Sequence, residues 1–417
     1  MSVWRDIDKL PRARWQEANL AHTFTLPRPV SYQQLCQALT AVDAKHESLR
    51  TVYDVSDPVN PRQRPLPAQQ FSQVEVAAAG RDDIEARVSA LVATPFDLTT
   101  DRTLRALAIA DGGEQADLIE LQAEPVITRL ALCLHHLSAD GFSVGLIWMD
   151  LLALLGIAGS PLPVPPNSLS EVAIEQRTGE SWQKKLRASQ RHFRAVYQAN
   201  VAEFADRDGD RGAVQAALES HQLADTAQRL ADDHKVSVAT VFTAAFLDAI
   251  VPHCWPGPIR IGLMTSNRFL QRWHHQVTTM NQLIPIVADA DPAADFGARL
   301  ADIQLATMRA YRLGLFDVDA VTPAALGLDL QPSEVGALCM FNIVEGAGAE
   351  YDDPDDPLAP QVHWEPVFTT IRAGCYLRAF RTVDHSIRLR LRTGGLTNDT
   401  CASILTDTYL RIMRAAA

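Results

Sequence analysis

The sequence lacks the excess of basic residues with which proteins hold nucleic acid. Its 417 residues contain 38 Lys plus Arg against 50 Asp plus Glu, a formal net charge of −12 at pH 7. A phosphate backbone is bound through clustered positive charge, so we expect no nucleic-acid partner. Hydrophobic residues make up 47% and charged residues 21% of the chain, which also excludes a mainly disordered or fibrous protein.

The sequence also lacks a secretory leader and a long uninterrupted apolar run. The opening residues, MSVWRD, contain no apolar core, and the longest apolar stretches, residues 144–156 and 236–251, are interrupted by Asp150 and Asp248. The six cysteines are scattered, with no C-x-x-C pair, which is typical of free thiols in a reducing compartment. We therefore expect a cytoplasmic protein with no membrane partner.

The length predicts two domains joined by a linker, since one domain usually holds roughly 100–200 residues. Residues 157–168 contain four prolines and no periodicity, as linkers do. Helical and strand patterns occur on both sides, so each half is predicted to be a mixed α/β unit. We expect an N-terminal lobe over residues 1–160 and a C-terminal lobe over residues 161–417.

A histidine pair follows a predicted strand over residues 126–134. The segment H-H-L-S-A-D-G places His135 and His136 at the end of this strand and Gly141 at the start of a predicted helix. Histidine suits proton transfer near neutral pH, Asp140 can orient an imidazole or pair with an arginine, and glycine permits a tight turn. A buried histidine with a capping aspartate is the alternative that these residues alone leave open. The other pair, H-H at 274–275, has no second ligand pair at zinc spacing, and we expect no metal.

The segment H-H-L-S-A-D-G resembles the H-H-x-x-x-D-G signature of the condensation-domain superfamily. This superfamily includes the condensation domains of nonribosomal peptide synthetases and related carrier- or CoA-dependent acyltransferases. Residues 45–53, K-H-E-S-L-R-T-V-Y, resemble the family segment R-H-E-x-L-R-T-x-F, in which we expect His46 to fix a turn between helix and strand. Residues 265–268 (T-S-N-R), 280–285 and 340–342 resemble further family segments, so the resemblance covers nearly the whole chain.

The resemblance implies a fold of two chloramphenicol-acetyltransferase-like α/β lobes in a V, with the active site at their interface. It implies an acyltransferase of natural-product and antibiotic biosynthesis that forms an amide or ester bond. The donor would be an acyl or peptidyl thioester on the phosphopantetheine arm of a carrier protein, and the acceptor an amine or alcohol. No cofactor would be bound permanently.

The resemblance also implies roles for individual residues. His136 is the expected catalytic residue, as the base for the nucleophile or as the acceptor that orients it. His135 is expected to point into the structure, because neighbours on an extended chain face opposite ways. Asp140 is expected to pair with Arg268 across the two lobes, since a buried carboxylate needs a compensating cation. Two further residues of the matched segments are expected to support the site, Gly141 and Asn342.

Several family segments are missing. The opening motif is only faintly visible at residues 10–15, and H-Q-D-x-P-F-E is not recognisable near residues 311–316, so we expect unusual carrier recognition. The absence of D-F-G-W-G and of D-x-x-x-x-D argues against plant-type acyltransferases and against heterocyclisation. With no adenylation or carrier segment in these residues, we expect a free-standing enzyme or an excised module.

Two other functions stay open. A CoA-dependent acyltransferase acting on a small molecule would need basic residues for the nucleotide, and Lys184, Arg187, Arg191 and Arg194 would form one stripe at helical spacing. Such a stripe equally suits a solvated face or an acidic carrier. A non-catalytic platform that recruits another protein is the third possibility, although platform members of the family typically lose the signature. We favour the carrier-bound donor, because both matched segments look most like peptide-synthetase condensation domains.

Overall fold

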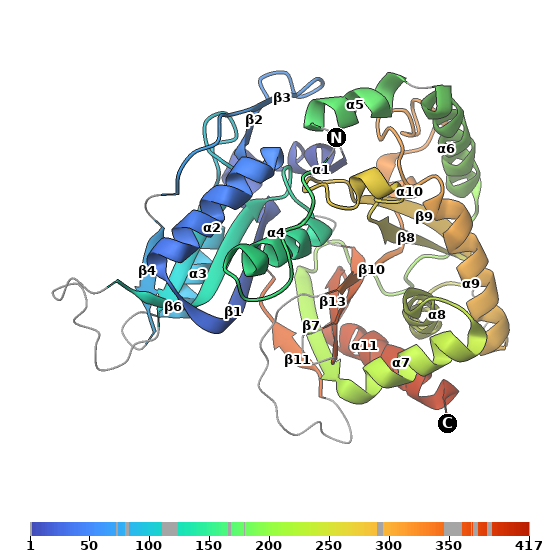
Figure 1. Cartoon of the computed structure of the whole chain (residues 1–417). Helices are drawn as coiled ribbons and strands as arrows, with labels where there is room; N and C mark the ends of the chain where they lie inside the picture. The colour runs from blue at the N-terminus through green and yellow to red at the C-terminus, as the bar shows by residue number, and fades with distance from the viewer. Residues whose placement is uncertain are drawn as a thin grey trace. The chain divides into compact units, whose positions relative to one another are not determined.

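The structure of the chain is a computed structural model (Figure 1). It describes residues 2–71, 74–79, 83–110, 124–165, 168–178, 180–289, 295–345, 361–367, 369, 374–381 and 386–416. Contacts divide the chain into two compact units. The N-terminal unit comprises Ser2–Glu175 and Arg268–Met280, and the C-terminal unit comprises Gln176–Asn267 and Asn281–Ala417. These bounds differ from the expected division after residue 160, because residues 161–175 and 268–280 pack with the N-terminal unit.

The N-terminal unit is a mixed α/β structure (Figure 1). Its described strands are β1 (Asn19–Ser31), β2 (Thr51–Asp54), β3 (Arg62–Pro65), β4 (Glu75–Ala78), β5 (Leu104–Ala110) and β6 (Val126–His135). Its described helices are α1 (Ser2–Ile7), α2 (Tyr32–Lys45), α3 (Ile84–Ala93), α4 (Gly141–Leu154) and α5 (Leu169–Thr178), with short 3-10 helices at Arg12–Ala18, Glu47–Arg50 and Gln271–Trp273. One sheet has the order β1-β6-β5-β4, in which only β4 and β5 pair in parallel, and β2 and β3 form a hairpin.

Strand β6 is buried on both faces, which explains its continuous apolar run. Leu130 and Leu132 face the cluster that contains the apolar residues of α2 and α4. Ala131, at the alternate position, belongs to a smaller cluster against which α3 packs. Because side chains alternate along a strand, the sequence of β6 decides which of its terminal residues faces which helix layer.

Helix α2 begins at a capping box, which the sequence supplies at its first turn. The Ser31 hydroxyl accepts from Gln34 N at 3.2 Å, and the Gln34 side chain accepts from Ser31 N at 3.1 Å. Two otherwise unpaired backbone donors are thereby satisfied. The cap fixes where α2 starts, and its apolar face, including Leu39, packs in the same cluster as Ile147 of α4.

The C-terminal unit is built on a seven-stranded mixed sheet (Figure 1). Its described strands are β7 (Ala213–Ser220), β8 (Ile259–Thr265), β9 (Gln282–Ala288), β10 (Cys339–Glu345), β11 (His363–Glu365), β12 (Cys375–Arg381) and β13 (Ile387–Gly394). Its described helices are α6 (Glu180–Gln198), α7 (His221–His234), α8 (Val238–Ile250), α9 (Phe296–Tyr311), α10 (Pro332–Val335) and α11 (Asn398–Ala415), with a 3-10 helix at Val251–His253. The strand order is β11-β7-β13-β12-β10-β8-β9, and β10 pairs in parallel with both β8 and β12.

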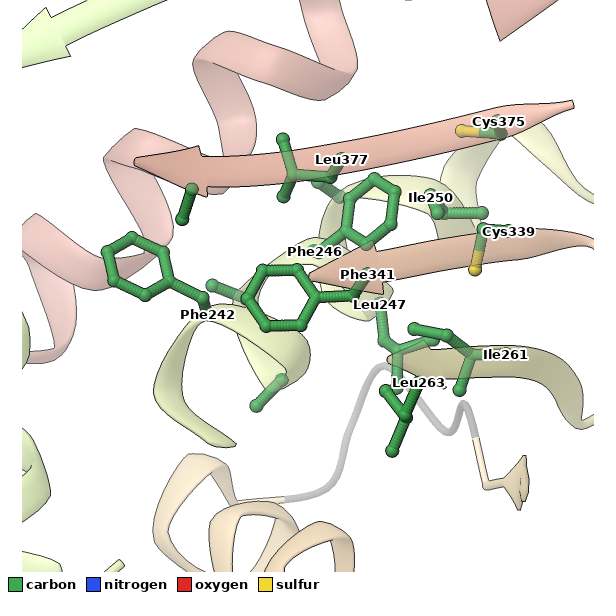
Figure 2. Packing of buried hydrophobic residues seen from close by; sticks show 14 of the residues in the cluster. Phe242, Phe246, Leu247, Ile250, Ile261, Leu263, Cys339, Phe341, Cys375 and Leu377 are labelled. Carbon is green, nitrogen blue, oxygen red and sulfur yellow. The ribbon is translucent and has the colours of Figure 1, made fainter. Parts of the chain in front are cut away.

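Helix α8 lies at the centre of the core of this unit. Phe242 and Phe246 are fully buried, and Figure 2 shows them packed with Phe341 of β10 and Leu377 of β12. The Phe242 and Phe341 rings stack with centroids 6.5 Å apart. A helix that is apolar all round is one that is buried all round. Helices α7, α8 and α11 thus cover the sheet face that carries Leu377, and alternate residues of β12 point to the opposite face.

The cysteines are free thiols, and five of the six are buried. Burial raises the pKa of Cys133 to about 11 and that of Cys401 to about 11. Within the described part of the chain, no single helix is long and apolar enough to cross a bilayer. One pair, α7 with Val238–His253, meets the length and composition criteria only in combination, and it is bent by 104°.

Candidate active site

The histidine loop connects the end of β6 to the start of α4, and backbone hydrogen bonds hold it. His135 N donates to Thr103 O at 3.1 Å, and His136 N donates to Ala18 O at 2.9 Å. Ser138 N donates back to His135 O at 2.9 Å, which closes the turn. Backbone hydrogen bonds to Thr103 and Ala18, both outside the loop, therefore help to position it.

The His136 side chain is half-buried, and its Nδ1 has a hydrogen-bond partner within the loop. Nδ1 lies 2.9 Å from Ala139 O. A carbonyl oxygen only accepts, so Nδ1 carries the hydrogen and donates it. In the neutral imidazole this places the lone pair on Nε2. The loop thus selects the tautomer in which Nε2 can accept a proton or a hydrogen bond.

The His135 side chain points the other way and is buried, with 1% of its surface exposed. It continues the β6 face that packs towards α3, and its ring meets the Phe96 ring edge-on at 5.9 Å between centroids. Its Nδ1 accepts from Leu137 N at 3.3 Å. Burial lowers the pKa of His135 to about 3, and the charges of His136 and Arg105 act in the same direction. A ring held neutral in this way does not serve as a proton acceptor at neutral pH.

Asp140 is the N-cap of α4 and one half of a buried ion pair. Its Oδ1 accepts from Ser143 N at 2.9 Å, and Met280 N donates to Oδ2 at 3.0 Å. The Arg268 guanidinium reaches both carboxylate oxygens, at 2.8 and 3.0 Å. Burial raises the pKa of Asp140, but the charge of Arg268 and these hydrogen bonds outweigh it and hold the pKa below its usual value. The predicted pairing of Asp140 with Arg268 is confirmed.

The prediction that this pair joins two lobes is wrong. The segment Arg268–Met280 belongs to the N-terminal unit, although it follows β8 of the C-terminal unit along the chain. Arg268 also donates to Thr278 O at 2.8 Å and to Gln276 O at 3.2 Å, and Val277 lies in the core cluster of α2 and α4. The ion pair therefore ties this returning segment to the first turn of α4.

Gly141 and Asn342 are the two other residues that were predicted to support the site. Gly141 is the first residue of α4, and its φ does not lie in the left-handed region, so no special backbone conformation requires a glycine there. The expectation that Gly141 permits a tight turn into α4 therefore finds no support in its backbone conformation. Asn342 lies on β10 of the C-terminal unit, half-buried and opposite Arg378 in register.

His46 lies at the turn between α2 and the 3-10 helix Glu47–Arg50, and its side chain contacts α4. Its Nε2 lies 2.8 Å from Asp150 Oδ2, on α4. Burial lowers the pKa of His46, although the bond to Asp150 opposes this, and the buried Nδ1 has no hydrogen-bond partner among the described residues. A neutral ring that donates from Nε2 fits both observations. Lys45 shares the same carboxylate at 2.7 Å, so the K-H-E segment ties the end of α2 to α4.

Sequence reasoning missed two contributors near the loop. The Ser143 hydroxyl donates to Asp140 Oδ1 or Thr278 O, both at 2.8 Å, and accepts from Arg268. A serine three residues after an N-cap aspartate was the signal that could have found it. Phe142 is 49% exposed beside this network, with the Arg268 guanidinium 4.7 Å from its ring centroid. Among the described residues, no group of three His, Cys, Asp or Glu side chains is arranged to hold a metal ion.

Comparisons with known proteins agree on one family. The Condensation domain family model matches residues 15–321. Among curated relatives, phosphinothricin tripeptide synthetase PhsC of Streptomyces viridochromogenes is 26% identical over 316 residues, which are 70% of this chain and 27% of PhsC. The chain thus spans about a quarter of the length of this relative.

Solved structures share the fold. A structure from work on condensation-domain-mediated chain release from the enacyloxin polyketide synthase superposes with a TM-score of 0.76 at 20% identity, covering 100% of this chain and 82% of that chain. The starter condensation domain of rhizomide synthetase RzmA, in complex with C8-CoA and Leu-SNAC, gives a TM-score of 0.74 at 15% identity and covers 99% and 92%. Structures of this kind have two chloramphenicol-acetyltransferase-like lobes, and the mixed α/β fold predicted from the sequence is confirmed.

Proposed function

The chain belongs to the condensation-domain family, and from that premise we propose that His136 handles the proton of the nucleophile in an acyl transfer. Condensation domains are acyltransferases that form amide or ester bonds in natural-product biosynthesis, and they act on acyl groups linked as thioesters to a carrier or to CoA. The role of His136 and the identity of the donor are the parts that we propose for this chain.

One observation carries the role of His136, namely the hydrogen bond from Nδ1 to Ala139 O. It fixes the tautomer, so that Nε2 is the accepting atom without any change in the loop. Because the ring is half-buried and its backbone is held at Ala18, its orientation is set before a substrate arrives. His135, buried and neutral, has no comparable opportunity.

With His136 as the one proton acceptor, every bond and proton of the proposed acyl transfer is accounted for. The nitrogen or oxygen of the nucleophile attacks the thioester carbonyl, a C–N or C–O bond forms, and the C–S bond breaks. His136 Nε2 accepts the proton that the nucleophile loses, or holds the nucleophile by accepting a hydrogen bond from it. The proton then passes to the departing sulfur, which leaves as a thiol. Asp140, Arg268, Ser143 and His135 act as positioning residues, because they hold the loop and α4.

We infer that the donor is an acyl or peptidyl group on a carrier protein, with CoA as the alternative. Two supports favour the carrier. The curated relative is named as a tripeptide synthetase, and the basic stripe Lys184, Arg187, Arg191 and Arg194 is exposed along α6, where an acidic protein surface could dock. The C8-CoA complex of the rhizomide domain favours the alternative. Free thiols and these partners are consistent with a cytoplasmic site of action.

A recruitment platform without catalysis is the second candidate function. The family signature argues against it, because a platform has no need of a tautomer-selecting loop. In this chain both histidines, Asp140 and Gly141 are present, and the Asp140 network is complete.

The test presents one acyl group in two ways, on a carrier protein and on CoA, to the full chain with a panel of amines and alcohols. Mass spectrometry then measures the product and the unloaded donor. We expect product from the loaded carrier at a higher rate than from CoA. Equal or faster turnover from CoA would overturn the donor assignment, and no product from either donor with any nucleophile would favour the platform.

A further inference from the structure

One face of the seven-stranded sheet carries a row of arginines. On β13, Arg388, Arg390 and Arg392 occupy alternate positions, and Arg378 of β12 lies opposite Arg390 in register. The residues between them, such as Leu389, pack in the helix-covered core. Since alternate side chains of a strand share a face, all four guanidinium groups project from the face opposite to α7, α8 and α11. We call these four residues the arginine row.

Two carboxylates compensate part of this charge. Glu365 of β11 pairs with Arg388 and with Arg390, and Glu219 of β7 lies 3.9 Å from Arg388. Although burial raises the pKa of Glu365, Arg390 and Arg388 outweigh it and hold the pKa below its usual value. Among the described residues, Glu365 and Glu219 are therefore the carboxylates that pair with Arg388 and Arg390.

Arg378 is the member of the row without a carboxylate partner in the described part of the chain. Its Nη2 donates to the neutral amide oxygen of Gln215 at 3.3 Å, and its Nε has no hydrogen-bond partner there. The guanidinium is half-buried, so water replaces these bonds only in part. Its remaining donors can hold an anion.

Aromatic rings keep the row in place. The Arg378 guanidinium lies 5.5 Å from the Tyr376 ring centroid and 5.6 Å from that of Phe380. The Arg390 guanidinium lies 5.2 Å from Phe380, and the Arg392 guanidinium 5.9 Å from Tyr376. Arginine stacked on aromatic faces keeps its planar set of donors and loses little freedom on binding.

Without a bound anion, this arrangement of arginines destabilises the sheet. Like charges directly opposite on neighbouring strands destabilise a sheet. Burial lowers the pKa of Arg390, and although Glu365 opposes this, Arg378 and Arg388 lower it further. A preorganised cluster of guanidinium groups is a common design for recognising carboxylate or phosphate, because guanidinium groups bind both through paired hydrogen bonds.

We propose that the arginine row binds one anionic group of a ligand, a phosphate or a carboxylate, with Arg378 as the residue that contacts it directly. The phosphate would come from a phosphopantetheine arm and the carboxylate from a small-molecule substrate. Asn342, opposite Arg378 in register, lies on the same face and can add a hydrogen bond. This site lies in the C-terminal unit and does not depend on the role of His136.

The experiment titrates the full chain by calorimetry at low ionic strength with inorganic phosphate, succinate, phosphopantetheine and pantetheine. We expect Arg378→Gln to weaken binding of the anions by about tenfold or more, the usual cost of one hydrogen bond to a charged group. Arg229→Gln, an exposed arginine on α7 across the sheet, is the matched control and is expected to bind as the parent does. Tighter binding of phosphopantetheine than of pantetheine would identify phosphate, and binding of succinate alone would identify a carboxylate.

The thermal stability of Arg378→Gln distinguishes a binding role of Arg378 from a structural role. Because Arg378 repels Arg390 and has no described carboxylate partner, Arg378→Gln without ligand is expected to unfold at or above the temperature of the parent. A marked loss of thermal stability would make Arg378 structural and overturn the proposal. Failure of every anion to bind, equal affinity in Arg378→Gln, or an equal loss in Arg229→Gln would overturn it as well. The titration measures binding without turnover, so these results are independent of the acyl-transfer proposal.

Discussion

Two adjacent histidines have opposite environments because they occupy opposite faces of one chain. His135 follows the β6 alternation into the layer beneath α3, where Phe96 covers it. His136 leaves the strand and enters a turn that binds its Nδ1 at Ala139. The same side chain is thus a buried core group at one position and a half-buried ring held at Nδ1 at the next.

The buried His135 makes stability depend on pH. Its pKa is about 3 in the folded chain against an ordinary 6.5, so the unfolded chain binds a proton that the folded chain refuses. Stability is complete above pH 6.5 and is expected to decline by on the order of a few kcal/mol as the pH falls towards 3. Asp140, whose pKa is lowered, loses its contribution only below its ordinary 3.8, so the range from 6.5 to 4 reports the histidines.

Urea unfolding at several pH values measures this decline. His135→Asn keeps an acceptor for Leu137 N and removes the titrating group, so its stability should change less between pH 6.5 and 4 than that of the parent. Parallel pH curves for the two proteins would show that His135 is not the group responsible.

At the scale of elements, one carboxylate fixes where α4 starts and what packs on it. Asp140 caps the helix at Ser143 N and receives Met280 N and Arg268 from the returning segment. Removing the charge leaves the buried Arg268 uncompensated. Asp140→Asn, which can retain the cap, is expected to cost about 3–5 kcal/mol of unfolding free energy, the usual result of breaking a buried pair.

A double-mutant cycle measures the pairing itself. Arg268→Met removes the cation, and the double variant Asp140→Asn with Arg268→Met should be more stable than the sum of the two single losses predicts. Chemical denaturation of the four proteins provides the four free energies. Strict additivity would mean that the contacts at 2.8 and 3.0 Å carry no coupling.

A second set of contacts holds the predicted linker to the N-terminal unit. Lys45 Nζ donates to Leu162 O and to Asp150 Oδ1, and Leu162 N donates to the same oxygen at 2.7 Å. Glu47 accepts from Leu169 N at 2.9 Å, at the start of α5. The segment that the prolines mark as a linker is therefore tied down at both of these points.

Limited proteolysis tests this attachment. Lys45→Met removes the cation that bridges Asp150 and Leu162, and the linker should be cut about tenfold faster, as expected for the loss of a charged hydrogen bond from a segment that opens before cleavage. Lys184→Met, on the exposed face of α6, should be cut at the parent rate. Equal cleavage in all three proteins would show that the Lys45 contacts do not restrain the linker.

At the scale of the whole molecule, the sequence predicted well what its matched motifs specify. The mixed α/β fold and the pairing of Asp140 with Arg268 were both predicted, because matched motifs carry them. The return of residues 268–280 to the N-terminal unit was not, since a linear pattern contains no record of which core a segment joins. Val277 is one apolar residue among many in the sequence, and only its packing with α2 and α4 reveals its place.

The arginine row shows the same limit at longer range. Alternating arginines on β13 are visible in I-R-L-R-L-R, but they read as an ordinary solvated strand face. Register with Arg378, and the compensation of Arg388 and Arg390 by Glu365, depend on pairings of β13 with β12 and of β11 with β7 that no local code specifies. Side-chain tautomers are equally invisible: that His136 donates from Nδ1 follows from the position of one carbonyl.

The most direct test of the account is the single-turnover rate of His136→Ala with a loaded carrier and an accepted nucleophile. The account predicts a loss of about a hundredfold to ten-thousandfold, the usual contribution of a positioned base, with the unfolding midpoint of the parent retained. His274→Ala, which changes an exposed histidine of the other pair, should turn over at the parent rate. A folded His136→Ala that turned over as fast as the parent would contradict the central claim.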